Sequence, residues 1–164
     1  MNMNFPATDR LRSEHRAMEQ LLEGFESDLS NPQGEGLLAL AKTFAEIQRH
    51  LATHFIEEEE VFYPALEPEL AAADPTFVKL KDDHSNVRET SAAIQAVLDQ
   101  APHGSDLPLS RRAELSSLGW ELWNQIHHHI EEEEQGLLAF ADRTLDGDAQ
   151  TRLAARMEDR RGSE

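Results

Sequence analysis

Apolar residues recur at alternating steps of three and four along most of this chain, and this spacing constrains its fold more than any other feature. Such steps keep side chains on one face of an α-helix, whereas a half-buried strand alternates at every second residue. Glycine and proline interrupt the pattern at Pro32 to Gly36, Pro64 to Pro75, Pro102 to Pro108 and Gly147. Four long segments remain, so the sequence predicts an all-α, up-down-up-down four-helix bundle.

A chain of 164 residues is long enough for one domain with its own hydrophobic core. We expect the bundle to occupy residues 1–145 and a short C-terminal extension to occupy residues 146–164. In this extension Leu153 and Met157 are spaced to share one side of a helix. The extension is therefore either a short fifth helix or a partly docked, frayed tail.

The amino-acid composition excludes or disfavours several classes of functional site and partner. The chain has no cysteine, which excludes disulfides, thiolate zinc sites, iron–sulfur ligation and a cysteine nucleophile, so a metal would need nitrogen and oxygen ligands. The 15 Lys and Arg residues stand against 32 Asp and Glu residues, and the net charge of −17 disfavours nucleic acid and anionic lipid as partners. The first residues, MNMNFPATDR, do not resemble a signal peptide, and no apolar run is long enough for a membrane span, so we expect a cytoplasmic protein.

Histidine and glutamate interrupt the apolar stripes of all four segments. In the second segment, for example, the stripe runs through Leu51, His54, Glu58 and Phe62. A charged group on a core stripe costs several kcal/mol unless it is paired or bound to a metal. Six such groups occupy stripe positions, namely His15, His54, Glu58, His84, His129 and Glu133. They are the candidate metal ligands of this chain.

The spacing of these groups predicts where they meet. A histidine and a glutamate four residues apart are neighbours on a helix, so His54 with Glu58 and His129 with Glu133 can each face one metal. Both pairs lie near the C-terminal ends of their helices, whereas His15 and His84 lie near N-terminal ends. Antiparallel packing brings these ends together, so the six groups should form one layer of the bundle.

Four imidazoles and two carboxylates suit iron or manganese better than a closed structural zinc site, which takes four ligands. Two metals are the natural number. If each glutamate bridges both metals and the histidines divide evenly, each ion has four protein ligands, and an oxo or hydroxo bridge adds a fifth. An octahedral ion then keeps one position for dioxygen, peroxide, nitric oxide or water.

Three runs of sequence, HFIEEEEVFYP, LKDDH and HHHIEEEEQGLLAF, resemble the hemerythrin-like HHE cation-binding family, and the resemblance extends to about residue 142. It implies a di-iron centre, with manganese or zinc as substitute metals. Carried over position by position, it implies the same six ligands that the stripes select.

The chain departs from the family pattern in two places. Oxygen-carrying members have a fifth histidine one turn after the histidine of the third helix, and Arg88 stands there in this chain, which argues against a pure oxygen carrier. His50, one turn before His54, is an alternative fifth nitrogen, although its place beside the stripe favours a partly exposed role. Ala139 stands where the second helix has Pro64, so the fourth helix is expected to run longer.

The register of the fourth helix has competitors, because His127–Glu131 and His128–Glu132 have the same spacing as His129–Glu133. The pair His129–Glu133 alone continues the stripe formed by Leu122, Ile126 and Leu137. We therefore favour this pair.

The acidic runs Glu57 to Glu60 and Glu131 to Glu134 otherwise fit solvated faces. Glu57 and Glu132 are candidates for supporting a ligand by a hydrogen bond. Tyr63 is a further candidate for a hydrogen bond near the site, although a core or surface role is favoured.

Three functions follow in order of preference. The first is a protein that binds or senses iron, dioxygen or nitric oxide. The second is a di-iron enzyme acting on peroxide or nitric oxide, including iron–sulfur cluster repair, and the third is a metal-free scaffold. Ferritin-like di-iron proteins use Glu-x-x-His, a spacing that this chain lacks. His103 falls in a predicted loop and is assigned no role.

Overall fold

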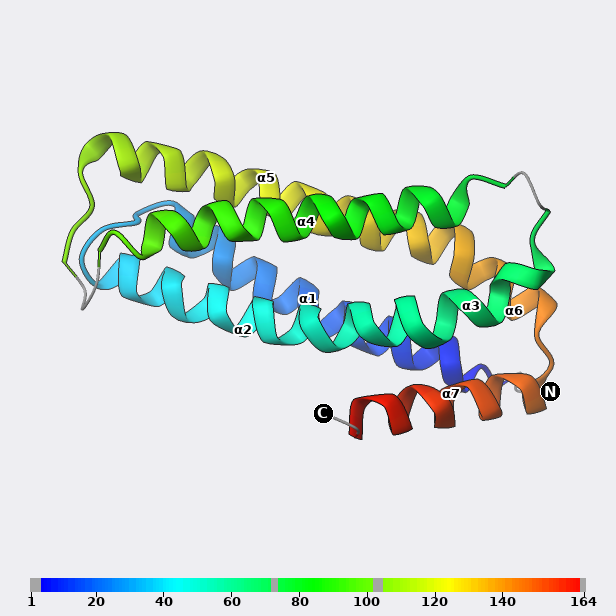
Figure 1. Cartoon of the computed structure of the whole chain (residues 1–164). Coiled ribbons are helices and arrows are strands. Elements are labelled where there is room, and N and C mark those ends of the chain that lie inside the picture. Colours follow the sequence, from blue (N-terminus) through cyan, green and yellow to red (C-terminus); the bar gives the residue numbers. More distant parts are fainter. Residues whose placement is uncertain (1–3, 72–73, 102–104, 163–164) are drawn as a thin grey trace.

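The computed structural model describes residues 4–71, 74–101 and 105–162. Four long helices form an antiparallel, up-down-up-down bundle (Figure 1). They are α1 (Pro6–Leu29), α2 (Glu35–Glu57), α4 (Thr76–Leu98) and α5 (Leu109–Glu133). The all-α bundle predicted from the apolar spacing is confirmed. His103 lies outside the described residues.

Helices α2 and α5 both continue through a wider, π-helical turn. Glu58–Phe62 (η1) leads from α2 into α3 (Tyr63–Leu66) and a 3₁₀ turn at Glu67–Glu69 (η2), and Glu134–Leu138 (η4) leads from α5 into α6 (Ala139–Thr144). The sequence pattern suggested that the second helix ends at Pro64, but the helical backbone continues past this residue. Pro64 lies in the first turn of α3, where a missing N–H is tolerated.

Two apolar clusters fill the bundle, one toward each end. Met18, Phe55, Val87 and Ile126 belong to the first, and Leu11, Val61, Leu80 and Leu137 belong to the second. Along each of the four helical rods, the candidate ligands fall between members of the two clusters. The chain thus builds one polar layer between two apolar layers, near the end of the bundle where α1 and α4 begin.

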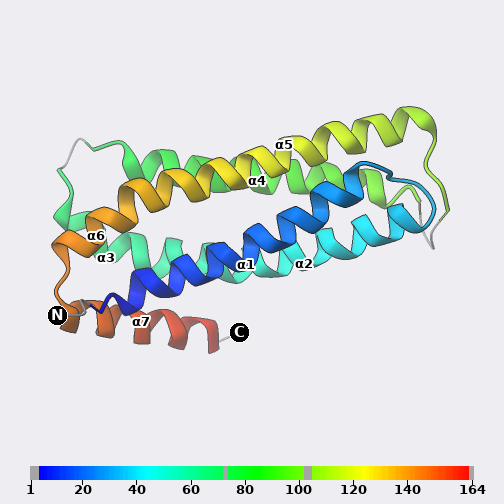
Figure 2. The same ribbon diagram turned by 180° about the vertical axis from the view of Figure 1, so that it is seen from behind.

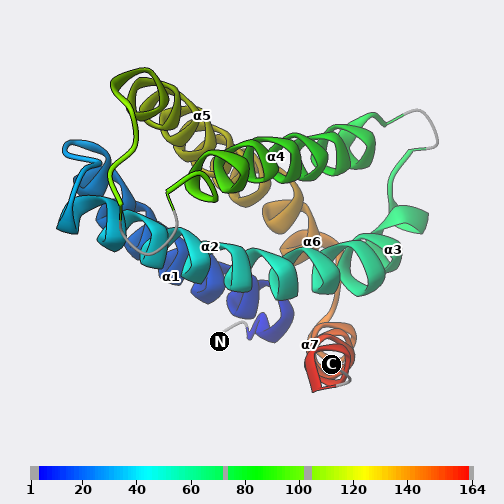
Figure 3. The ribbon, with the colours of Figure 1, turned by 60° about the vertical axis from the view of Figure 1, so that its left-hand side comes forward.

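The C-terminal extension is a helix, α7 (Gly147–Gly162), and not a frayed tail. It lies outside the bundle against α1, α2 and η1 (Figures 2 and 3). Leu153 and Met157 are buried, as their spacing suggested, and so is Gln150. The Gln150 Oε1 atom accepts the N–H groups of Ala7 and Thr8 at 3.1 and 3.3 Å, and so caps the start of α1. The division of the chain into a bundle at residues 1–145 and an extension at residues 146–164 stays a prediction.

None of the helices in the described part of the chain is both long and apolar enough to cross a membrane.

Candidate metal centre

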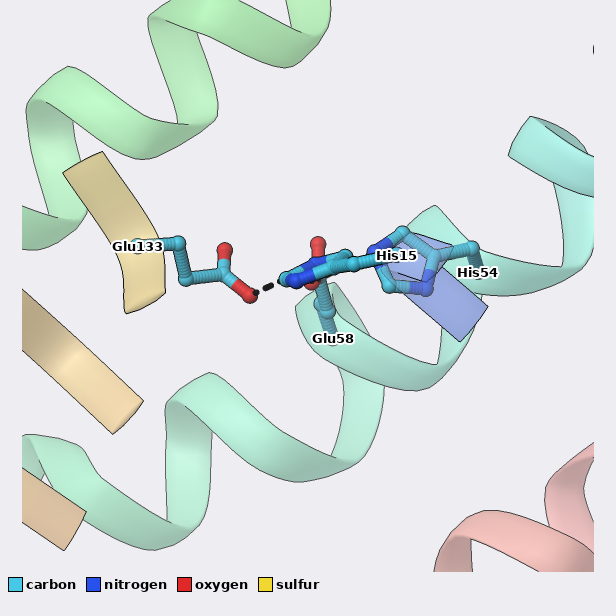
Figure 4. Close-up of side chains that lie close together, drawn as sticks. All are labelled: His15, His54, Glu58 and Glu133. Atoms are coloured by element: carbon cyan, nitrogen blue, oxygen red, sulfur yellow. Dashed lines mark ion pairs between the residues drawn. The ribbon is translucent and has the colours of Figure 1, made fainter. Parts of the chain in front are cut away.

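The structure brings all six stripe residues into one buried layer. Each of the four helical rods contributes one histidine, whereas Glu58 begins η1 directly after α2 and Glu133 is the last residue of α5. None of the six is more than 4% exposed. Figure 4 shows four of them, with the Glu133 carboxylate directed at the His15 ring.

The six residues form two overlapping groups that share both glutamates. The first group is His15, His54, Glu58 and Glu133, and the second is Glu58, His84, His129 and Glu133; in each, the candidate ligand atoms lie within 4.8 Å of one another. Each histidine pair comes from one helical hairpin, the first from α1 and α2 and the second from α4 and α5. This is the even division expected for two bridged ions.

Each carboxylate turns one oxygen to each histidine pair. Glu58 Oε1 lies 2.8 Å from His54 Nε2, and its Oε2 lies 3.0 Å from His84 Nε2. Glu133 Oε1 lies 3.6 Å from His15 Nε2, and its Oε2 lies 3.3 Å from His129 Nε2. Both glutamates are therefore arranged to bridge two cations.

All four histidines use Nδ1 to contact an acidic side chain on the outer side of the layer. The pairs are His54 with Glu14 at 2.7 Å, His84 with Glu59 at 2.7 Å, His15 with Glu134 at 3.1 Å and His129 with Asp83 at 3.4 Å. A carboxylate at Nδ1 keeps a hydrogen there and directs the lone pair of Nε2 inward. Histidines that bind metals are commonly held in this way.

A basic side chain pairs with each of these outer carboxylates in turn. The pairs are Arg161 with Glu14, Arg88 with Glu59 at 3.0 Å, Arg16 with Glu134 at 2.6 Å and Lys79 with Asp83 at 3.4 Å. The charge of the outer carboxylates is thus balanced from outside. The two inner carboxylates face the four imidazoles instead.

The charges of the layer shift its pKa values strongly. Burial alone would lower the pKa of His54, but Glu58 and Glu14 outweigh burial and raise that pKa to about 10. Burial would raise the pKa of Glu58, yet the neighbouring histidines, His54 first, hold it well below its usual value. Without metal, the His54 ring is thus doubly protonated at neutral pH, and its positive charge stabilises the inner carboxylates.

Tyr63 lies inside the layer, although the sequence favoured a core or surface role. Its hydroxyl hydrogen-bonds Glu133 Oε2 at 2.8 Å and Glu58 Oε2 at 3.1 Å, and lies 3.3 Å from His84 Nε2. Burial, followed by these two carboxylates, raises the pKa of Tyr63 well above its usual value. The hydroxyl therefore keeps its proton and donates it, on the side of the second group.

Three inner atoms remain buried without a hydrogen-bond partner, namely His15 Nε2, Glu58 Oε1 and Glu133 Oε1. Glu58 Oε1 is close to His54 Nε2, but the two do not meet the geometry of a hydrogen bond. All three atoms belong to the first group. Buried polar atoms left unpaired are costly, and a cation between them would satisfy all three. The residues therefore fit a site for two metal ions.

The competing candidates lie outside both groups. His127 is half-buried and His128 is exposed, and they pair with Glu131 and Glu132 at 3.4 and 3.0 Å. His50 Nε2 contacts the backbone carbonyl oxygen of Glu14 at 3.0 Å and does not join the layer.

Arg88 also points away from the layer, where it pairs with Glu59 and lies 5.3 Å above the Phe55 ring. Glu57 and Glu132, the acidic residues singled out for support of a ligand, instead contact Arg10 and Lys79.

The four outer carboxylates were missed by the sequence interpretation, yet a signal for them exists. Glu14 directly precedes His15 and Asp83 directly precedes His84, whereas Glu59 and Glu134 directly follow the inner glutamates. The same two positions are thus acidic in both halves of the chain.

Comparison with protein families gives one result. A family model described as the Hemerythrin HHE cation binding domain matches residues 7–141. The chain therefore belongs to this family, and its fold is that of a hemerythrin-like bundle with an added C-terminal helix. Comparisons with curated proteins and with solved structures gave no significant match.

Proposed function

We propose that this protein is a non-haem di-iron protein that binds or senses iron, dioxygen or nitric oxide. The observation that carries the proposal is the placement of the two glutamates. Each glutamate has one carboxylate oxygen near the first histidine pair and the other oxygen near the second pair. His15, His54, Glu58, His84, His129 and Glu133 are the proposed ligands. Imidazole and carboxylate together suit iron, with manganese or zinc as substitutes.

A small cavity beside the first group supports a diatomic ligand. The cavity has a volume of ≈ 10 Å³, about enough for one water-sized molecule. His15, His54 and His129 line it on the side of the layer. Its other walls are mainly apolar and are formed by Met18, Leu51, Phe55, Val87, Ile126 and Ile130, with Glu14 and His50 as the polar exceptions. Iron held by the six residues would supply open coordination positions for dioxygen, nitric oxide or peroxide.

The chain's own side chains prepare this position. The outer carboxylates hold the four imidazoles in one orientation, and the apolar walls limit access of water. Arg88 pairs with Glu59 and does not reach the layer, so the fifth histidine of oxygen carriers has no counterpart at that position. This favours a sensor or a binding protein over a carrier.

One observation favours a second candidate, a di-iron enzyme acting on peroxide or nitric oxide. The Tyr63 hydroxyl is a buried proton donor in contact with both inner carboxylates. A donor in this place is able to supply a proton to a bound oxygen species. Iron–sulfur cluster repair is a less favoured form of this candidate, because the chain has no cysteine to offer thiols.

The two candidates differ in turnover. The protein is loaded anaerobically with ferrous iron, freed of excess metal, and mixed with dioxygen, nitric oxide or peroxide. A stable, stoichiometric change in the absorption spectrum without turnover supports the binding protein. Release of oxygen from peroxide beyond one equivalent per site supports the enzyme. The absence of any response to the three ligands would contradict both the enzyme and the binding of dioxygen or nitric oxide, and failure to take up iron would contradict the binding of iron.

A further inference from the structure

Helix α7 lies outside the segment that matches the family, yet it reaches the candidate metal centre. Arg161, near the end of α7, contacts Glu14 Oε1. The other oxygen of the same carboxylate, Oε2, lies 2.7 Å from His54 Nδ1. A continuous chain of polar contacts therefore runs from α7 through Glu14 to a proposed ligand.

The position of Arg161 distinguishes His54 from the other three histidines. The basic residues that pair with the remaining outer carboxylates belong to the bundle itself, with Arg16 on α1 and both Lys79 and Arg88 on α4. Arg10 of α1 also lies near Glu14, but at 3.8 Å. The closest positive charge on the His54 side is thus supplied from outside the four-helix bundle.

Arg161 also contacts a second carboxylate, that of Glu57, next to Glu14. Its Nε lies 2.9 Å from Glu57 Oε1, and Arg10 Nη2 lies 2.9 Å from the same oxygen. Glu57 is fully buried and Glu14 is 8% exposed. Without Arg161, Arg10 would still face both carboxylates, but its nearest contact with Glu14 is 3.8 Å, so Glu14 would be held less firmly against His54.

The rest of α7 is seated firmly enough to position Arg161. Leu153 and Met157 are buried against the bundle, Gln150 caps α1, and Arg160 Nε contacts Glu60 Oε2 at 2.5 Å. The helix therefore carries Arg161 to a defined place next to η1.

We propose that Arg161 is a positioning residue of the metal centre, and that the docking of α7 and the binding of metal stabilise each other through Glu14 and His54. The inference rests on the proposed di-metal function. Coupling between two sites is reciprocal. If docking of α7 raises the affinity for metal, bound metal must stabilise the docking of α7 by the same free energy. Metal binding would therefore change how stably α7 docks on the surface of the bundle.

The test compares Arg161→Gln with Arg161→Lys and with Arg156→Gln. Arg156 is an exposed arginine of the same helix, and the contacts of Glu14 and Glu57 in the described structure do not include it. Arg156→Gln thus removes the same charge without touching the carboxylates. Lysine keeps the charge of Arg161 but lacks the fork that spans both carboxylates.

Three measurements are made on the full chain. The first is the rate at which a chelator removes ferrous iron under anaerobic conditions. The second is hydrogen exchange of the α7 amides with and without iron. The third is the ¹⁵N resonance of His54 Nδ1 in the metal-free protein, with that of His84 as internal reference, because a purely structural role of Arg161 would not move one histidine alone.

We expect iron release from Arg161→Gln to be about threefold to tenfold faster than from the wild type, less than the effect of removing a direct partner of a ligand. Iron should protect the α7 amides in the wild type and in Arg156→Gln, and much less in Arg161→Gln. The His54 resonance should shift in Arg161→Gln while that of His84 stays. Arg161→Lys should fall between the wild type and Arg161→Gln.

Wild-type values for Arg161→Gln in all three measurements would overturn the coupling and leave the metal centre standing. So would equal changes in Arg161→Gln and Arg156→Gln, which would mean that any loss of charge from α7 has the same effect. A wild-type protein that takes up no iron would instead overturn the proposed function, and the coupling with it.

Discussion

Every proposed histidine ligand is held by an acidic residue that is the sequence neighbour of another proposed ligand. Glu14 precedes His15 but holds His54, and Glu134 follows Glu133 but holds His15. In the same way, Asp83 precedes His84 but holds His129, and Glu59 follows Glu58 but holds His84. Two short sequence patterns, each used twice, thus supply the inner and outer parts of the site.

Substitution of an inner residue should remove metal. We expect His54→Ala or Glu58→Ala to lose at least one of the two irons and to lower the Tm of the loaded protein by about 5–10 °C, because metal that binds the folded state stabilises it. His128→Ala is the matched control, since His128 is exposed and pairs with Glu132 outside the layer. Iron content and thermal unfolding measured on all three variants check this, and equal losses from His128→Ala would refute the assignment.

Loss of the Tyr63 hydroxyl should weaken the metal-free protein in particular. Tyr63→Phe removes a hydrogen bond that serves two buried carboxylates, at an expected cost of about 1–3 kcal/mol in the free energy of unfolding. Urea unfolding of the iron-free form measures this cost, and the variant should still take up iron because the six proposed ligands are intact. Unchanged iron-free stability would mean that the hydroxyl contributes nothing to the layer.

Iron uptake should release protons. The pKa of His54 is raised to about 10, so its ring is doubly protonated at pH 7.5 and must lose a proton to bind metal, and the pKa of His129 is shifted in the same direction. We expect at least one proton per chain at pH 7.5, and the share from His54 should fall as the pH rises through about 10. Titration calorimetry in buffers of different ionisation enthalpy measures the release. Uptake without protons at pH 7.5 would show that these histidines are neutral.

At the scale of single elements, the π-helical turns explain why Tyr63 was underrated. In an uninterrupted α-helix, a residue five positions after Glu58 lies about 140° around the axis from it. The turn at Glu58–Phe62 instead closes a hydrogen bond from the Tyr63 N–H to the Glu58 carbonyl oxygen, and both side chains then reach the same layer. Such turns are frequent at functional sites, and the apolar spacing gives no sign of them.

The cap that α7 places on α1 gives a prediction of its own. Gln150 is 1% exposed and accepts two N–H groups at the start of α1. Gln150→Ala leaves these groups unpaired and should lower the free energy of unfolding by about 1–2 kcal/mol. Denaturant unfolding of the variant measures this, with Thr151→Ala on the exposed side of the same helix as control. A smaller loss from Gln150→Ala than from the control would show that α7 does not support α1.

At the scale of the whole molecule, the sequence predicted the bundle and brought its six stripe residues together, because helical spacing and antiparallel packing determine both. Apolar spacing did not separate Glu14 or Glu134 from solvated acidic residues, because it marks only the core face of a helix, and the one sequence signal for them is that the same positions are acidic in both halves of the chain. The long-range contact of Arg161 with Glu14 was equally hidden, because helical periodicity in α7 says nothing about which helix it docks on.

The whole fold places one polar layer between two apolar clusters, and the central claim is that two metal ions complete this layer. Elemental analysis of the full chain, after anaerobic loading with ferrous iron and removal of excess metal, tests the claim most directly. Two irons per chain is the result predicted from the two overlapping groups of ligands. A value near zero would contradict the claim, and would leave the unpaired inner atoms of His15, Glu58 and Glu133 without the cation that we propose lies between them.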